Sequence, residues 1–168
     1  MILGVVLAGG RSSRFGSNKA DALLAGRSLV EHARAQLAAH VATTLIVGGA
    51  AGDIADLPRP GLGPLGGIAG ALDRAASLGY VSVLTIACDM PRVPDALIAE
   101  LAKRAPAYCA DAPVLGHWPT AAGAQLIADM AASDDHSVRR WARAIGAVEV
   151  ATASPLPNVN TPADLAAL

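Results

Sequence analysis

The sequence contains a glycine-rich stretch whose residue types are suited to binding phosphate. Residues 7–19 (LAGGRSSRFGSNK) hold three glycines, two arginines and a lysine, and they begin where the apolar run from Ile2 to Ala8 ends. Glycines allow a sharp turn and bring backbone N–H groups close to a ligand, while Arg14 and Lys19 supply the charge that a polyphosphate attracts. We therefore expect a nucleoside triphosphate site here. The alternative is a surface loop whose cations are simply solvated.

The spacing of these glycines matches neither of the two common phosphate-binding motifs. A P-loop requires G-x-x-x-x-G-K-[ST], whereas five residues separate Gly10 from Gly16 and a serine follows. The dinucleotide-binding fingerprint G-x-G-x-x-G is also missing from this stretch. The loop is therefore a glycine nest of another type.

A carboxylate follows a second apolar run. Asp89 comes just after the run from Val81 to Ala87 and before Pro91. Mg²⁺ is usually bound through one or two carboxylates together with substrate phosphates. A carboxylate opposite a cationic loop therefore predicts a magnesium site that a phosphate group completes. The alternative, a cap for the next helix, is disfavoured because that helix is expected to begin several residues later, near Pro94.

Short apolar runs and helical patterns alternate along the chain, which predicts an α/β fold with a mainly parallel sheet and helices on both faces. The expected strands are 2–8, 43–47, 54–57, 81–87, 107–110, 114–115 and 147–151. The expected helices are 28–38, 65–78, 95–104, 124–132, 137–145 and 163–168, with Ser28 and Glu31 forming a capping box at the first. Because ligands bind beyond the carboxyl ends of such strands, the glycine loop and Asp89 should share one edge of the sheet.

The whole chain fits one domain, residues 1–168, with 53% hydrophobic residues and a net charge of -1. That charge disfavours a nucleic-acid partner. No run approaches the roughly 18 apolar residues of a membrane span, and the first residues resemble no secretion signal, so we expect a cytoplasmic protein without a membrane partner. Cys88 and Cys109 match no metal-ligand spacing and are expected to be buried thiols.

Two further segments carry polar or glycine-rich patterns. Gly63 and Pro64 open a helix in GPLGGI, where backbone amides could receive a base edge or ribose oxygen; tight helix packing is the alternative. The segment NVNTPAD (158–164) combines two amides, a hydroxyl and a helix cap, a pattern that is also common in plain turns.

These segments, in this order, resemble one family. Residues 7–19, GPLGGI, CDMP (88–91) and NVNTPADL (158–165) resemble motifs of the molybdenum cofactor guanylyltransferases, a MobA-like nucleotidyltransferase family. The resemblance runs from Gly4 to the end of the sequence. The first motif alone indicates only the wider nucleotidyltransferase superfamily. The family resemblance implies a three-layer Rossmann-like fold and transfer of GMP from GTP to the phosphate of Mo-molybdopterin, with release of pyrophosphate.

The resemblance also implies roles for single residues. Arg14 and Lys19 would contact the triphosphate, Asp89 would hold Mg²⁺, and Asn158 and Asn160 would face the acceptor. The implied nucleotide-binding residues are Leu7, Ala8, Gly9, Gly10, Lys19, Gly63 and Pro64. Such a reaction needs no protein nucleophile, because the acceptor phosphate attacks the α-phosphorus in line, so Arg14, Lys19 and Asp89 are the expected catalytic residues.

Two other residues are candidates for contact with the acceptor. His117 precedes Trp118-Pro119-Thr120, which resembles a His-Pro-Thr strand of the family; a structural histidine is the alternative. Arg139 lies in a basic helical segment that could bind the acceptor's phosphate. The alternative there is a solvated basic face opposite an apolar one.

The chain departs from the family pattern just before GPLGGI. The family has an acidic residue there that helps to hold guanosine, whereas this chain has Arg59-Pro60-Gly61-Leu62, and Asp56 or Asp53 could replace the acid only if the loop folds back. Segment 120–158 is also shorter than is typical. A nucleotidyltransferase of other specificity therefore remains open: cytidylyl transfer to molybdopterin, or guanylyl or uridylyl transfer to another phosphorylated acceptor. A binding module without catalysis is disfavoured by the joint presence of Arg14, Lys19 and Asp89. Transient contact with other cofactor-biosynthesis or delivery proteins is a further expectation.

Overall fold

The computed structural model describes residues 1–9, 19–49 and 52–168. Within them, the main sheet has six strands in the order β4-β1-β5-β7-β6-β8. Their bounds are β1 Ile2–Leu7, β4 Thr43–Val47, β5 Ser82–Ala87, β6 Ala107–Cys109, β7 Gly116–Pro119 and β8 Val148–Val150. A separate two-stranded hairpin pairs β2 (Leu23–Leu24) with β3 (Arg27–Ser28).

The main sheet is mostly parallel, as the sequence predicts. Strand β1 pairs in parallel with β4 and β5, and β6 pairs in parallel with β8. Strand β7 pairs antiparallel with both β5 and β6, so it alone among the described strands of this sheet runs in the opposite direction. The carboxyl ends of the other five therefore open at one edge, which is where α/β proteins bind ligands.

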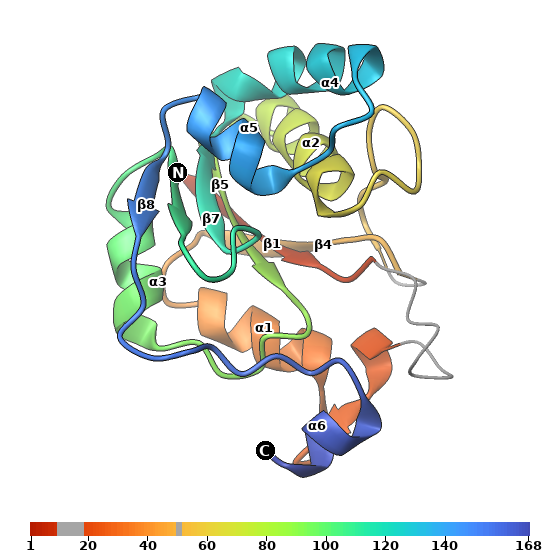
Figure 1. The fold of residues 1–168 in the computed structure, drawn as a ribbon, viewed down its shortest axis with the longest axis vertical. Helices are drawn as coiled ribbons and strands as arrows, with labels where there is room; N and C mark the ends of the chain where they lie inside the picture. The colour runs from red at the N-terminus through yellow and green to blue at the C-terminus, as the bar shows by residue number, and fades with distance from the viewer. Residues whose placement is uncertain (10–18, 50–51) are drawn as a thin grey trace.

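Helices cover both faces of the sheet (Figure 1). Helices α2 (Pro64–Ser77), α4 (Gly123–Ala132) and α5 (Val138–Ala144) pack on one face, and α1 (Leu29–Leu37) and α3 (Asp95–Ala102) pack on the other. Strand β1 explains the division, because Leu3, Val5 and Leu7 belong to the first core while Val6 belongs to the second. Successive side chains of a strand point to opposite faces, so an all-apolar strand needs a helix layer on each side.

Local signals fix where two of these helices begin and end. Ser28 caps α1: its Oγ accepts from the Glu31 N–H at 3.2 Å, and its own N–H donates to Glu31 Oε2 at 2.7 Å. This is the capping box that the sequence predicts. Helix α2 ends before Gly79, whose φ of +80° ends the helix in the conformation that glycine adopts most easily.

Two expected strands differ from the structure. Residues 114–115 belong to a turn, in which the Leu115 N–H donates to the Ala112 carbonyl at 2.9 Å, and the strand β7 begins only at Gly116. Residues 54–57 make no strand beyond a single bridge between Ile54 and Val47. The N–H groups of Asp53 and Ile54 instead both donate to the Ile46 carbonyl.

The last part of the chain returns to the ligand-binding edge. After β8 it runs past α1 without regular structure and ends in the short helix α6 (Pro162–Ala166), as Figure 1 shows. Two 3₁₀ helices, Lys19–Asp21 and Thr120–Ala122, complete the elements of the described residues. Among the helices of the described residues, none combines the length and the apolar character that crossing a membrane would require.

Candidate functional site

A cavity of about 640 Å³ lies at the carboxyl ends of β1, β5 and β6. This volume is within the range of small-molecule binding sites. It is lined by Leu7, Ala8, Gly9, Lys19, Pro64, Ala87, Cys88, Asp89, Met90, Asp111, Ala112, Val114, Pro155, Leu156 and Asn158. Residues from the glycine loop, from the end of β5 and from the C-terminal segment therefore meet in one place.

Two polar side chains of the cavity wall, Lys19 and Asp89, contact each other, and a third residue supports the lysine. The Lys19 ammonium lies 2.9 Å from Asp89 Oδ2 and donates a second hydrogen bond, of 3.3 Å, to Asn160 Oδ1. The Lys19 and Asp89 side chains are 17% and 24% exposed, so the pair is shielded from bulk solvent yet still reachable from the cavity. Asp89 balances the lysine charge in this arrangement, and the two residues lie at the same edge of the sheet, as the sequence predicts.

The NVN segment is fixed to Asp89 through its backbone. The Val159 N–H donates to the Asp89 carbonyl at 2.9 Å, and the Val159 side chain is fully buried. Because Val159 points inward, its two asparagine neighbours point elsewhere: Asn158 lines the cavity and Asn160 reaches Lys19. The buried Val159 thus anchors the segment, and the amides on either side of it are placed at the site.

The turn after Asn160 is closed by Asp164. Its Oδ2 accepts hydrogen bonds of 2.8 Å from the N–H groups of both Asn160 and Thr161, and the Asp164 N–H donates to Thr161 Oγ1. The bonds from the Asn160 and Thr161 groups stabilise the carboxylate, and they hold the pKa of Asp164 below its usual value. The motif read from the sequence as amides, hydroxyl and cap is therefore one connected turn that begins helix α6.

The part of the cavity wall at the end of β1 depends on a close backbone approach. The Ala8 N–H donates to the Val47 carbonyl at 2.9 Å, which brings the end of β1 against the end of β4. A Cβ on Gly48, whose φ is +72°, would lie 2.9 Å from the Gly9 Cα. Only glycine fits at position 48, because both the backbone angle and the contact with Gly9 exclude a side chain.

The other predicted nucleotide-binding residues divide into three groups. Leu7, Ala8, Gly9 and Pro64 line the cavity, with Pro64 in the first turn of α2. Gly63 is the residue just before that helix, with a φ of +70°, and it is not among the lining residues. Gly10 and Arg14 lie outside the described residues.

His117 is not part of the cavity, and the structure contradicts a contact with the acceptor. Its Nδ1 lies 3.0 Å from the carbonyls of Leu101 and Arg104 at the end of α3, and its Nε2 lies 2.8 Å from Ser82 Oγ. The side chain is buried, and that burial lowers the pKa of the imidazole. His117 joins β7 to the beginning of β5 and to α3, away from the carboxyl edge of the sheet.

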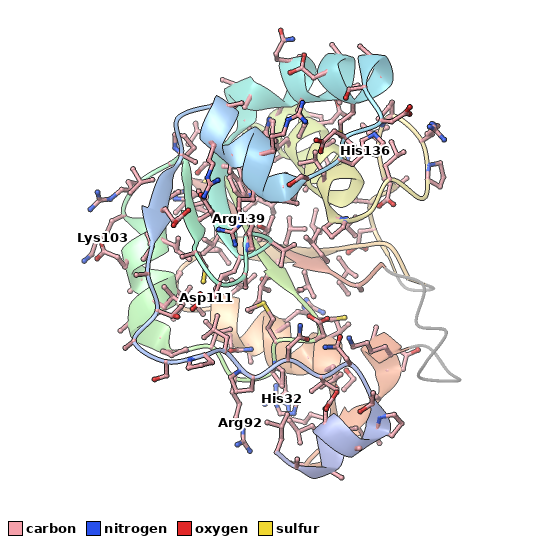
Figure 2. All side chains as sticks on the ribbon, in the orientation of Figure 1. His32, Arg92, Lys103, Asp111, His136 and Arg139 are labelled. Carbon is pink, nitrogen blue, oxygen red and sulfur yellow. The ribbon has the colours of Figure 1, made fainter. Side chains whose placement is uncertain are left out.

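Arg139 adjoins the cavity without lining it. Its guanidinium donates a 2.5 Å hydrogen bond to the Ala110 carbonyl and lies 3.6 Å from Glu149 Oε2. Figure 2 labels Arg139 and, below it in that view, Asp111. The arginine thus fixes the end of β6, next to a residue that does line the cavity.

Neither Asp53 nor Asp56 lines the cavity. Asp53 Oδ2 accepts from the Ile46 N–H at 3.0 Å and so closes the turn after β4. Asp56 lies against the first turn of α2, where a Cβ on Gly67 would be 3.6 Å from its Oδ1. The loop before GPLGGI therefore folds back onto α2 without bringing an acid into the cavity wall.

Several cavity residues were not predicted from the sequence, and Asp111 is chemically the most distinctive of them. It follows β6 in the way that Asp89 follows β5, so a carboxylate after a strand end was the signal that could have identified it. Cys88 was expected to be buried, and it is 6% exposed. Burial raises the pKa of its thiol to about 11, so Cys88 stays protonated at neutral pH.

A divalent metal fits this site only with help from a ligand. Among the described residues, no group of three or more His, Cys, Asp or Glu side chains could hold a metal ion. Asp89 offers one hard carboxylate oxygen donor, which suits Mg²⁺ when phosphate oxygens and water complete its coordination. The residues present therefore match a metal that is bound together with a nucleotide.

The chain is similar to a known family over most of its length. Residues 4–150 match the family model of the MobA-like NTP transferase domain. A molybdenum cofactor guanylyltransferase of Rhizobium leguminosarum bv. trifolii is 36% identical over 188 residues, covering 98% of this chain and 90% of that protein. One from Rhizobium johnstonii is 38% identical over 189 residues, with the same coverage of 98% and 90%.

A solved structure has the same fold. The crystal structure of molybdopterin-guanine dinucleotide biosynthesis protein A from Archaeoglobus fulgidus superposes with a TM-score of 0.74 and 22% sequence identity, covering 98% of this chain and 95% of that one. At this level of identity the similarity supports the three-layer architecture alone.

Proposed function

The chain belongs to the MobA-like NTP transferase family, and we propose that it transfers GMP from GTP to the phosphate of Mo-molybdopterin, releasing pyrophosphate. The observation that carries this proposal is the contact between Lys19 and Asp89 in the wall of one cavity at the carboxyl edge of the sheet, with Asn160 bonded to the lysine. The choice of guanine as the base and of the molybdenum cofactor as the acceptor is supported by the names of the relatives with 36% and 38% identity, both molybdenum cofactor guanylyltransferases.

The reaction exchanges one phosphoanhydride bond for another. An oxygen of the acceptor phosphate attacks the α-phosphorus of GTP, and the bond from the α-phosphorus to the bridging oxygen of the β-phosphate breaks as pyrophosphate leaves. No protein side chain forms a covalent bond. The task of the protein is to orient two anions and to offset the negative charge that develops between them.

Lys19 carries the positive charge for this task. When a triphosphate enters the cavity, its oxygens compete with Asp89 for the lysine ammonium, and Asn160 keeps the lysine directed into the site. Asp89 is then free to hold Mg²⁺, which when bound supplies Lewis-acid stabilisation of phosphate charge. In this proposal Arg14 provides a second cation, and Leu7, Ala8, Gly9, Gly10, Gly63 and Pro64 surround the nucleotide.

The acceptor is proposed to lie on the side of the cavity formed by the C-terminal segment, with Asn158 toward it. Arg139 supports that side through the Ala110 carbonyl. The proposal further includes a single domain over residues 1–168, a cytoplasmic location, and transient contact with proteins that make or deliver the cofactor.

The decisive experiment offers the purified protein Mg²⁺, Mo-molybdopterin and each of the four ribonucleoside triphosphates in turn. Pyrophosphate release and the dinucleotide product are measured, the latter by mass spectrometry. We expect product with GTP alone. A product with CTP would move the assignment to cytidylyl transfer, and the absence of any GTP-dependent product would contradict the proposal.

A further inference from the structure

Asp111 places a second carboxylate in the cavity wall, separate from Asp89. Its carboxylate accepts a hydrogen bond from Thr152 Oγ1 at Oδ2. The two acids follow β6 and β5, and β7 lies between those strands in the sheet. Two strand spacings amount to roughly 10 Å, so the carboxylates mark separate parts of one cavity.

The turn that carries Asp111 is held in place by buried hydrogen bonds. Thr85, which is fully buried in β5, donates to the Val114 carbonyl at 2.6 Å, and the Cys109 N–H donates to the Leu115 carbonyl at 2.8 Å. On the other side, Arg139 fixes the Ala110 carbonyl. Residues 110–115 therefore form a preorganised wall, and Asp111 projects from a rigid base.

Asp111 is exposed, and the cavity-lining residues next to it are apolar. Ala112 and Val114 follow it in the turn, and Pro155 and Leu156 follow its partner Thr152; all four line the cavity. A carboxylate set beside small aliphatic side chains favours a flat heterocycle that presents N–H donors at its edge. Two adjacent N–H donors can bind the two oxygens of one carboxylate, as a guanidinium does.

We propose that Asp111 binds the aminopyrimidinone edge of the acceptor's pterin ring, while the acceptor's phosphate end lies at Lys19 and Asp89. The ring N–H and the exocyclic amino group of a pterin are adjacent donors and match this carboxylate. Thr152 sets the orientation of the carboxylate and is a positioning residue. This inference rests on the proposed function, since it concerns the acceptor of that reaction.

The test uses pterin and lumazine, which differ in that lumazine has a carbonyl where pterin has the amino group. Their intrinsic fluorescence reports binding to the full-length protein directly. We expect the wild type to bind pterin at least about tenfold more tightly than lumazine, because the carbonyl faces a carboxylate. Asp111→Asn should bind pterin roughly ten- to a hundredfold more weakly, in the range for hydrogen bonds to a charged group.

The same substitution should also change the preference between the two rings. An asparagine amide accepts from the ring N–H and donates to the lumazine carbonyl, so Asp111→Asn should bind lumazine as well as pterin or better. A purely structural role for Asp111 would weaken both ligands equally. Thr152→Val should reduce the preference for pterin partially, and Asp129→Asn, on the exposed side of α4, should leave it unchanged.

The inference and the proposed function can fail separately. Two results would contradict the role of Asp111 even if GMP transfer proceeds. One is a wild type that binds pterin and lumazine equally at millimolar concentrations. The other is an Asp111→Asn variant that keeps both the preference for pterin over lumazine and the KM for molybdopterin. If the preference depends on Asp111 but no GTP-dependent product forms, the inference stands and the proposed reaction falls. Unchanged GTP affinity in Asp111→Asn is the expected control.

Discussion

The ammonium of Lys19 lies 2.9 Å from Asp89 Oδ2, although 70 positions separate the two residues in the chain. This ion pair is a consequence of strand direction. Lys19 follows the loop after β1, Asp89 follows β5, and the two strands are parallel neighbours with Leu7 paired to Ala87. In this structure each charge satisfies the other, and in the proposed reaction a triphosphate and its metal would replace both partners.

Removing the charge of Asp89 should stop transfer while leaving the fold intact. Asp89→Asn keeps the shape and the backbone bond from Val159, so its melting temperature should stay close to that of the wild type. The rate of pyrophosphate release should fall by roughly 10²–10³-fold, as when one stabilising group is lost from a charged transition state. Asp95→Asn, an exposed carboxylate beside His40, is the matched control and should be fully active. Near-wild-type turnover by Asp89→Asn would refute the metal-binding role.

Asn160 should act through Lys19, which a double-mutant cycle can measure. Asn160→Ala alone is expected to lower kcat/KM by about tenfold, because Lys19 loses its 3.3 Å partner. In a Lys19→Ala background the same change should cost less than about twofold. Asn158→Ala, which removes a cavity-lining amide that is not bonded to Lys19 in the described residues, should be additive with Lys19→Ala. An additive Asn160 effect would mean that its amide contacts a substrate instead.

Val159→Ala should impair the transfer reaction more than an equally destabilising substitution elsewhere in the core. Val159→Ala deletes two buried methyl groups and should destabilise the protein by about 1–2 kcal/mol in chemical denaturation. Val138→Ala on α5, where the valine is 8% exposed, should cost a similar amount. Only Val159→Ala should raise the KM of the transfer reaction, since it alone loosens the segment that carries Asn158 and Asn160. Equal kinetic effects of the two variants would show that general destabilisation is responsible.

Gly48 should tolerate alanine much less well than Gly26 does. Both glycines have positive φ, +72° and +80°, so alanine is strained at either position. At Gly26 nothing lies within 4 Å of the added Cβ, and the cost should be about 1–2 kcal/mol. At Gly48 the Cβ meets the Gly9 backbone at 2.9 Å, so Gly48→Ala should cost at least about 3 kcal/mol and raise the KM for GTP. A Gly48→Ala protein with unchanged stability would contradict the close approach of the two backbones.

Burial of Cys88 predicts a loss of stability in alkaline solution. The pKa of its thiol is raised from its ordinary value of 9.0 to about 11 in the folded protein, because burial disfavours the thiolate. The unfolded chain therefore releases its proton first as the pH rises, and the free energy of unfolding decreases between pH 9 and 11, by up to about 2.5 kcal/mol. Below pH 9 this contribution is fully present. Cys88→Ala should show a shallower decrease across the same interval, measured by urea denaturation at each pH. An identical pH dependence of the two proteins would contradict the raised pKa.

Strand direction explains why the centre of the site could be predicted from the sequence. Apolar runs without alternation indicate buried parallel strands, and parallel strands open their carboxyl ends at the same edge. The glycine-rich stretch and Asp89 each follow such a run, so placing them at one edge required no knowledge of side-chain contacts. The capping box of Ser28 and Glu31 was equally accessible, because both partners lie within one helical turn.

Contacts to backbone groups explain what the sequence could not predict. His117 was predicted to contact a ligand, yet its Nδ1 faces the carbonyls of Leu101 and Arg104. The sequence does not reveal which backbone carbonyls at a helix end lack a partner within the helix. Strand β7 was placed too early because Gly116 and Pro119 have low strand propensity, while its pairing with β5 and β6 provides the stability. Asp111 was overlooked for a related reason: its turn is held by Thr85 from a neighbouring strand.

The contacts of Lys19 with Asp89 and Asn160 also bear on the order in which the proposed site forms during synthesis. The hydrogen bond from Lys19 to Asn160 spans 141 positions, whereas β1, β4 and β5 are all complete by Ala87. Chains leave the ribosome N-terminal end first, at about 5–20 residues per second. The central strands can thus pair early. The hydrogen bond from the Val159 N–H to the Asp89 carbonyl and the one from Lys19 to Asn160 can form only after the C-terminal segment has been synthesised. A chain that ends before Val159 would therefore contain the paired central strands but lack the contacts that complete the proposed site.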